Sequence, residues 1–103
     1  MEYREIMYIR TITKCKSITK AADSLYIAQP SLSQALHRVD EYYGAVFFWR
    51  TKAGLVITDA GKAYLEAADK MEKLYNDAKE ELKNSPEKMG RICFGTPSAQ
   101  GGV

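Results

Sequence analysis

The sequence has few residues that could build a metal centre or a disulfide framework. Its 103 residues include two cysteines, Cys15 and Cys93, and a single histidine, His37. Because the cysteines lie far apart, they predict neither a metal site nor a cross-linked scaffold. We expect both to be small core or strand residues in a reducing cytoplasm. His37 is expected to be a surface or phosphate-facing residue.

The sequence also lacks a long apolar run. No uninterrupted hydrophobic stretch approaches the ~18 residues of a membrane span, and the start MEYR is unlike a signal peptide. We therefore expect a soluble, cytoplasmic chain with no membrane partner. No nucleophile with its base, metal cluster or phosphate loop stands out, so no enzyme is predicted. A share of 46% apolar residues is enough for a compact core.

The net charge of +2 is small, but the charge is unevenly distributed. Residues 1–57 hold eight Lys/Arg and five Asp/Glu, a net charge of +3. Residues 58–103 hold seven Lys/Arg and eight Asp/Glu, a net charge of −1. The basic excess in the first half favours a polyanionic partner for that half.

Residues 16–44 contain two short helical patterns separated by a turn of about four residues, which is typical of a helix-turn-helix. The first pattern, 18–25, contains the small pair Ala21-Ala22, which would let a second helix approach closely. Ser17 is its predicted N-cap. Lys16 stands where the preceding helix would prefer glycine, and a left-handed backbone there costs about 1 kcal/mol.

The second pattern begins at Gln29 and runs to about Tyr42. Pro30 suits its first turn, where a missing N–H is no loss. Gly44 is the expected residue just past its end. Its predicted buried residues are Leu32, Leu36 and Val39.

Further elements flank this motif. A first helix from Tyr3 to about Thr13 is predicted from the spacing of Tyr3, Ile6, Ile9, Ile12 and Thr13. Two β-prone runs in residues 46–57 predict a two-stranded wing. A lone hairpin is marginal in water, so the aromatic residues at its edge should pack in the core and the wing. These residues are Tyr42, Tyr43, Phe47, Phe48 and Trp49.

A long helix is predicted over residues 58–84, beginning at the N-cap pattern Thr58-Asp59. Its apolar positions follow steps of four and three, as in a coiled-coil seam. A helix of this length needs cover, which is expected from the same helix of a second chain or, alternatively, from another part of a longer protein. Its small residues favour an antiparallel pairing. The predicted dimer interface consists of Ala60, Tyr64, Ala67, Met71, Leu74 and Ala78.

The expected organisation is a DNA-binding domain at 1–57, a linker helix at 58–85 and a hinge at 86–103. The last segment includes the alternation of one strand, from Gly90 to Gly95. One strand cannot stand alone. We therefore expect it to begin a further domain whose remainder lies outside the sequence.

Several motifs match one family in order and spacing: Ala21-Ala22, Gln29-Pro30-Ser31-Leu32-Ser33, Gly44, Phe48 with Arg50, and Thr58-Asp59-Ala60-Gly61. With the first helix, they resemble the N-terminal DNA-binding region of LysR-type transcriptional regulators over nearly the whole chain. The resemblance implies a mainly α fold: a winged helix-turn-helix of three helices and a two-stranded wing, followed by a long dimerisation helix. It also implies a bacterial, cytoplasmic homodimer or tetramer on double-stranded DNA.

The family's effector-binding domain is then missing, so no cofactor is expected in this fragment and a small-molecule effector is expected in the missing domain. The sequence departs from the family pattern at Lys16, where glycine is usual, and at Ala28, where a serine or threonine cap is common. The second basic residue of the wing tip falls on Ala53. Lys52 can take its place.

Helix 29–42 is expected to enter the major groove with its first turn. Glutamine can pair bidentately with adenine, and proline can contact a thymine methyl. The predicted base-reading residues are Gln29, Pro30, Ser33 and Gln34. The candidates for phosphates, which fix register rather than sequence, are Ser17, Thr19, Lys20, Ser31 and Arg38. Arg50 and Lys52 on the wing can reach the backbone or the minor groove.

A different class of function is a protein-interaction adaptor that uses helix 58–84 as a coiled coil and keeps the helix-turn-helix as a scaffold. The two classes differ in salt dependence. A DNA-binding protein loses affinity for duplex DNA steeply as salt suppresses counterion release.

Overall fold

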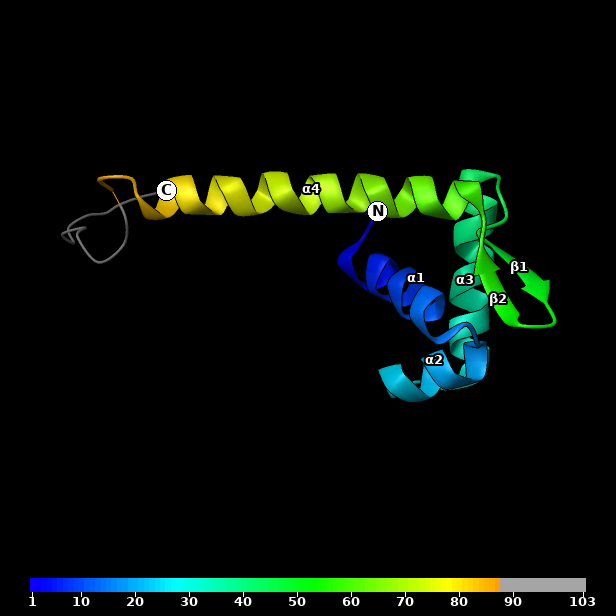
Figure 1. Ribbon diagram of the computed structural model, residues 1–103. Helices are drawn as coiled ribbons and strands as arrows, with labels where there is room; N and C mark the ends of the chain where they lie inside the picture. The colour runs from blue at the N-terminus through cyan, green and yellow to red at the C-terminus, as the bar shows by residue number, and fades with distance from the viewer. Residues whose placement is uncertain (88–103) are drawn as a thin grey trace. The chain divides into compact units, whose positions relative to one another are not determined.

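The computed structural model describes residues 1–87 and contains three helices, a two-stranded hairpin and a long fourth helix (Figure 1). The fold class predicted from the sequence is confirmed. The predicted strand at 90–95, Cys93 and the rest of 88–103 lie outside the described residues. The elements are α1 (Tyr3–Cys15), α2 (Ile18–Leu25), α3 (Gln29–Tyr43), β1 (Phe48–Thr51), β2 (Gly54–Ile57) and α4 (Asp59–Lys83).

The chain divides into a compact unit at Met1–Lys70 and a second unit that begins at Met71. In the first unit α1 packs against α2, α3 and β2, and α2 packs against α3. Ala21 and Ala22 are at most 1% exposed, so the backbone of α2 approaches its neighbours closely, as predicted. The other predicted core residues that are buried are Ile6, Ile9 and Ile12 of α1 and Leu32 and Val39 of α3. Leu36, predicted to be buried with them, is only partly buried and packs against the edge of this core.

Tyr3 does not join this core. It was predicted on the same stripe as Ile6, but its side chain is 70% exposed. Tyr3 is the first residue of α1, and the buried face of that helix begins only at Ile6. The 3.6-residue spacing therefore assigned the correct face but placed its start one turn too early.

Among residues 1–87, two non-glycine residues have a left-handed backbone, and each ends a helix. Lys16 ends α1 with φ 59°, as its position in the sequence predicted. Tyr26 ends α2 with φ 58° and is 94% exposed, which the sequence did not signal. Ser17 then caps α2, since its Oγ accepts a hydrogen bond from the backbone N–H of Lys20 at 3.2 Å.

We expect Lys16→Gly to raise the free energy of unfolding by about 1 kcal/mol, because glycine adopts φ 59° without a Cβ penalty. Urea unfolding of the two chains measures the difference. Lys16→Ala is the matched control, since it removes the same long side chain and keeps the Cβ. An equal gain in Lys16→Ala would assign the effect to the side chain instead of the backbone.

The hairpin exposes one of its faces. Phe48 pairs with Ile57, and Trp49 pairs with Val56 in the antiparallel register. Because side chains alternate along a strand, Phe48 is buried, whereas Trp49 is 58% exposed and Val56 is 42% exposed. The prediction that Trp49 packs in the wing is wrong for this reason. The same prediction for Tyr42 is also wrong, as Tyr42 is 80% exposed near the end of α3.

Thr58 joins the hairpin to α4 through a set of buried hydrogen bonds. Its backbone N–H donates to the Phe47 carbonyl at 2.9 Å, and its Oγ1 donates to the Val46 carbonyl at 2.6 Å. The same Oγ1 accepts from the Gly61 N–H at 3.1 Å, so Thr58 caps the N-terminus of α4, as predicted. On the other side, the Asp40 carboxylate accepts from the Phe47 N–H at 3.2 Å. Burial raises the pKa of Asp40, although this hydrogen bond opposes the rise.

The first turns of α4 belong to the core of the first unit. Gly61, Tyr64 and Ala68 are buried, and the Tyr64 ring contacts Phe47 with centroids 5.1 Å apart. The Tyr64 hydroxyl donates to the Glu5 carboxylate at 2.5 Å. The pKa of Tyr64 is raised, mainly by burial of its hydroxyl and secondly by this hydrogen bond to Glu5. These contacts explain why the first unit extends to Lys70, beyond the domain end expected at residue 57.

Candidate nucleic-acid interface

A groove beside α3 gathers residues from both helices of the helix-turn-helix and from the wing. It has a volume of about 370 Å³ and is lined by residues 16–19, Gln29, Ser33, Arg50, Thr51 and residues 54–55. Five of the predicted contact residues meet here although they are distant in sequence. They are Ser17, Thr19, Gln29, Ser33 and Arg50.

One backbone contact joins two of the residues that line this groove. The left-handed turn at Lys16 directs its carbonyl to the Leu55 N–H, which donates to it at 2.9 Å. Gly54, with φ 110°, allows the approach, because a Cβ at this position would lie 2.6 Å from the Lys16 carbonyl oxygen. The wing is therefore attached directly to the turn that begins the helix-turn-helix.

The chemistry of the groove suits an anion. Two of its lining residues, Lys16 and Arg50, are cationic and exposed, and several others carry hydroxyl or amide groups. Neither Asp nor Glu occurs among the lining residues in the described part of the chain. Ser17 uses its oxygen to cap α2, which leaves its hydroxyl proton able to donate outward. Donors and cations without carboxylates are the groups that phosphate oxygens require.

Thr19 and Gln29 contact each other across the groove. Thr19 lies in the first turn of α2, and Gln29 is the first residue of α3. The Thr19 hydroxyl donates to Oε1 of Gln29 at 3.2 Å. Both side chains are exposed, so the pair lies at the surface where a ligand would dock.

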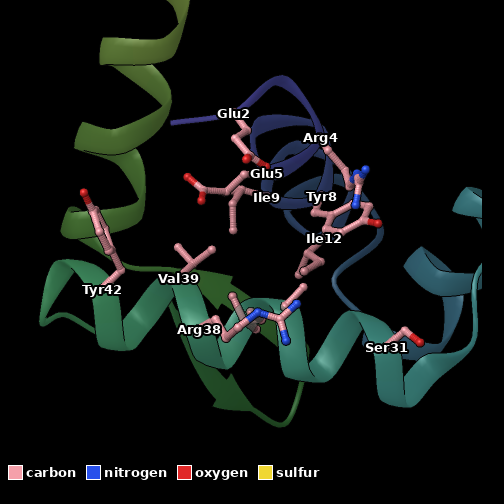
Figure 2. A pocket seen from close by; sticks show the side chains of 12 residues that line it. Glu2, Arg4, Glu5, Tyr8, Ile9, Ile12, Ser31, Arg38, Val39 and Tyr42 are labelled. Carbon is pink, nitrogen blue, oxygen red and sulfur yellow. The ribbon is translucent and has the colours of Figure 1, made fainter.

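Two of the predicted phosphate contacts lie on another side of α3. Ser31 and Arg38 line a depression of about 400 Å³ between α1 and α3 (Figure 2). Arg4 of α1 lines the same depression and was missed by the sequence analysis. A basic residue in the first turn of α1 was the available signal, but the sequence could not place that turn beside α3. Glu2 and Glu5 also line the depression, so its charge is mixed.

The remaining predicted contact residues line neither hollow. Pro30, Gln34 and Lys20 are exposed near the starts of α3 and α2. Lys52 is exposed in the hairpin turn, and its neighbour Ala53 donates its N–H to the Thr51 hydroxyl at 3.1 Å. All of them are accessible, and a partner that covers the start of α3 would meet Pro30 and Gln34 first.

His37 is exposed on α3, as expected, but it has a carboxylate partner. Its Nε2 lies 3.5 Å from Oε2 of Glu41 one turn later. Within residues 1–87, no cluster of His, Cys, Asp and Glu is arranged to hold a metal ion. The helices of this same region include none with the length and apolar character that crossing a membrane requires.

The predicted dimer residues on α4 differ in their exposure. Tyr64 is 6% exposed because it packs in its own core, so it offers little surface to a second chain. Ala60 is half-buried, whereas Ala67 and Ala78 are exposed. Met71 and Leu74 are 50% and 70% exposed.

Comparisons with known proteins agree on one family. Residues 3–62 match the family model described as bacterial regulatory helix-turn-helix protein, lysR family. The chain is 33% identical over 100 residues to the HTH-type transcriptional regulator BudR of Klebsiella aerogenes, covering 96% of this chain and 70% of BudR. It is 29% identical over 102 residues to the uncharacterised regulator YcgK of Bacillus subtilis, covering 98% of this chain but 32% of YcgK.

Several similar solved structures are DNA complexes. The DNA complex of the CbnR DNA-binding domain matches 79% of this chain and 93% of that domain, with 26% identity and a TM-score of 0.66. The BenM DNA-binding domain on benA site 1 DNA matches 81% of this chain and 96% of that domain, with 30% identity and a TM-score of 0.67. The chain spans only 28% of full-length CbnR.

Proposed function

The chain belongs to the lysR family of bacterial regulatory helix-turn-helix proteins, and on this premise we propose that it binds double-stranded DNA for a transcription regulator. The observation that carries the proposal is the groove beside α3, which combines Gln29, Ser33 and Arg50 without a carboxylate. In this proposal the chain has a binding role and no catalytic one.

The proposed binding mode places the first turn of α3 in the major groove. An α-helix fits this groove, and residues at its N-terminal end reach the base edges. Gln29, Pro30, Ser33 and Gln34 are all exposed at that end of α3. The two solved complexes of CbnR and BenM DNA-binding domains support this mode, because they have the same fold and contain DNA.

The phosphate contacts would then flank α3 on two sides. Ser17 and Arg50 lie with the wing-side groove, whereas Ser31 and Arg38 lie with the depression towards α1. Groups on both sides of a readout helix can contact the two strands that border the major groove. Such contacts hold the helix in register without reading sequence.

We also propose that the chain acts as a homodimer through α4. In the second unit, Met71, Leu74, Tyr75 and Leu82 are large apolar residues that are at least half exposed. Leu74, Tyr75 and Leu82 follow Met71 by three, four and eleven residues, which places all four on one stripe of the helix. An exposed apolar stripe of this kind is a typical helix-pairing surface. The adaptor function that would use α4 alone is not favoured, because it leaves the groove beside α3 without a ligand.

Location and regulation complete the proposal. We propose that the protein is bacterial and works in the cytoplasm, where the DNA that it binds is located. We propose that the whole protein forms dimers or tetramers and responds to a small-molecule effector. The chain spans only about a third of relatives such as YcgK.

Titration of the 103-residue chain with duplex DNA at several salt concentrations tests the function. A protomer that neutralises about four phosphates should lose about 100-fold in affinity between ~50 and ~200 mM salt. The titration uses a pool of random duplexes. Sequences that the chain binds best are then selected from this pool and define the selected site. Affinity that is absent at low salt, or that does not change with salt, would reject the proposed function.

Side-chain removal separates base reading from positioning. We expect Ser33→Ala to weaken binding to the selected site by about 1–3 kcal/mol and to leave binding to random DNA nearly unchanged. Gln29→Ala should behave in the same way. Arg50→Ala should instead weaken both by a similar factor and reduce the salt slope by about 1. Fluorescence titration of each variant on both kinds of DNA measures the difference. Equal losses on both for Ser33→Ala would remove Ser33 from the base-reading set.

A further inference from the structure

The hydrogen bond between Thr19 and Gln29 limits what Gln29 can offer to a base. Thr19 Oγ1 donates to Gln29 Oε1 at 3.2 Å, so the carbonyl oxygen of the amide is turned towards α2. The amide nitrogen is bonded to the same carbon on the opposite side and is therefore turned away from Thr19. A glutamine amide has one acceptor oxygen and one NH₂ group with two donors. Its outward-facing group in this chain is the NH₂ donor.

This orientation does not suit the bidentate pairing of glutamine with adenine. In that pairing the amide oxygen must accept from adenine N6 while the nitrogen donates to N7. The oxygen of Gln29 has a second lone pair, but its hydrogen bond with Thr19 turns it towards α2, so the oxygen and the nitrogen cannot face the same base edge together. An NH₂ donor is matched instead by O6 and N7 of guanine or by O4 of thymine, whereas adenine places the N6 amino donor beside its N7 acceptor and so opposes a second donor.

We propose that Thr19 is a positioning residue that makes Gln29 select a keto base, guanine or thymine, over adenine in the major groove. The proposal deepens the proposed DNA-binding function and rests on it. The pair is exposed in the free protein, where water competes for the hydrogen bond. At a DNA interface that excludes water, the bond becomes stronger and its orienting effect increases.

The same hydrogen bond changes the role of Thr19 itself. A threonine hydroxyl has a single proton, and here that proton is directed to Gln29. Phosphate oxygens only accept, so the Thr19 hydroxyl cannot donate to a phosphate while it holds Gln29. Ser17 differs, because its oxygen accepts from Lys20 and its proton remains available. Of these two neighbours, Ser17 is the phosphate contact and Thr19 is the positioning residue.

Selection from a pool of random duplexes tests the proposal with the full 103-residue chain and the variants Gln29→Ala, Thr19→Val and Thr19→Ser. The base pair that Gln29 contacts is the one at which Gln29→Ala loses its preference. Defined duplexes that differ only at this pair then give affinities for all four bases. Valine has the shape of threonine without the hydroxyl, and serine restores the hydroxyl.

The original chain should prefer guanine or thymine over adenine at this pair by about tenfold. In Thr19→Val the freed oxygen can accept from adenine, so that preference should fall about tenfold or reverse. Thr19→Ser should restore the original preference. Thermal unfolding and circular dichroism confirm that each variant is folded. A merely structural role for Thr19 would change the affinity for all four duplexes equally.

Three results would overturn the proposal while the DNA-binding function stands. They are a preference for adenine in the original chain, an unchanged preference in Thr19→Val, and a Gln29→Ala profile identical to that of the original chain. Failure of the original chain to bind any duplex at low salt would instead reject the proposed function, and this inference with it.

Discussion

Replacing both Met71 and Leu74 by lysine is expected to convert the dimer to monomers and to lower the affinity for a two-half-site DNA by about 100-fold or more. Each side chain is at least half exposed in the single chain, so the substitutions leave its own core intact. In a dimer they would bury charges without partners, which is strongly unfavourable. Sedimentation equilibrium measures the mass, and a DNA titration at fixed salt measures the affinity.

Lysine is the informative choice because it adds positive charge. If charge alone mattered, the double variant would bind DNA more tightly, so a loss of affinity must come from the loss of pairing. Asn76→Lys with Glu80→Gln is the matched control, since it changes the net charge by the same +2. Asn76 and Glu80 lie on the side of α4 opposite the stripe of Met71 and Leu74. A double lysine variant that stays dimeric would reject the proposed interface.

Replacing Thr58 by valine is expected to lower the free energy of unfolding by about 2–4 kcal/mol. Thr58 is 7% exposed, and its hydroxyl satisfies two groups, the Val46 carbonyl and the Gly61 N–H. Valine has nearly the same shape but leaves both groups without this partner. An unsatisfied buried polar group costs about 1–3 kcal/mol, and the loss of an N-cap adds to the effect. Urea unfolding followed by circular dichroism measures the change.

Thr58→Ser is the matched control, because serine keeps the hydroxyl and loses only a methyl group. It should lose about 1 kcal/mol or less. If serine destabilised the chain as much as valine, packing of the methyl group would explain the effect and the hydrogen bonds would not. The DNA affinity of the folded fraction should be nearly unchanged in both variants, since Thr58 does not line the groove beside α3.

The sequence predicted the helices well because their ends have local causes. Ser17, Gly44 and Thr58 are a cap, a left-handed terminus and a second cap, as their positions indicated. Local rules act over a few residues, and such distances are visible in a sequence. Lys16 was recognised as a departure in the same way, and its backbone is left-handed as expected.

The exposed aromatic residues were predicted poorly. A β-prone run containing Trp49 does not reveal which face of the hairpin meets the helices, and one step along a strand reverses the face. Tyr64 illustrates the same limit on a helix. Its spacing fits the seam of α4, but contacts with Phe47 and Glu5, distant in sequence, bury it in its own domain.

The candidate site was predicted as a set of residues rather than as a geometry. The motifs identified Gln29, Ser33 and Arg50, but only the fold shows that they line one groove. No local pattern indicates that Thr19 bonds to Gln29, since the two side chains meet only through the angle between α2 and α3. That angle depends on core packing, which a single sequence does not display.

The backbone hydrogen bond between Lys16 and Leu55 sets the position of the wing relative to the helix-turn-helix. Because it attaches the wing to the helix-turn-helix, the span from Gln29 to Arg50 is held by the protein and cannot adjust freely. If Gln29 and Arg50 both contact DNA as proposed, we expect the duplex to conform to this fixed span, and the elastic work of doing so depends on the steps between the contacted bases. Sequences that already have the matching groove width are favoured at positions that no side chain touches.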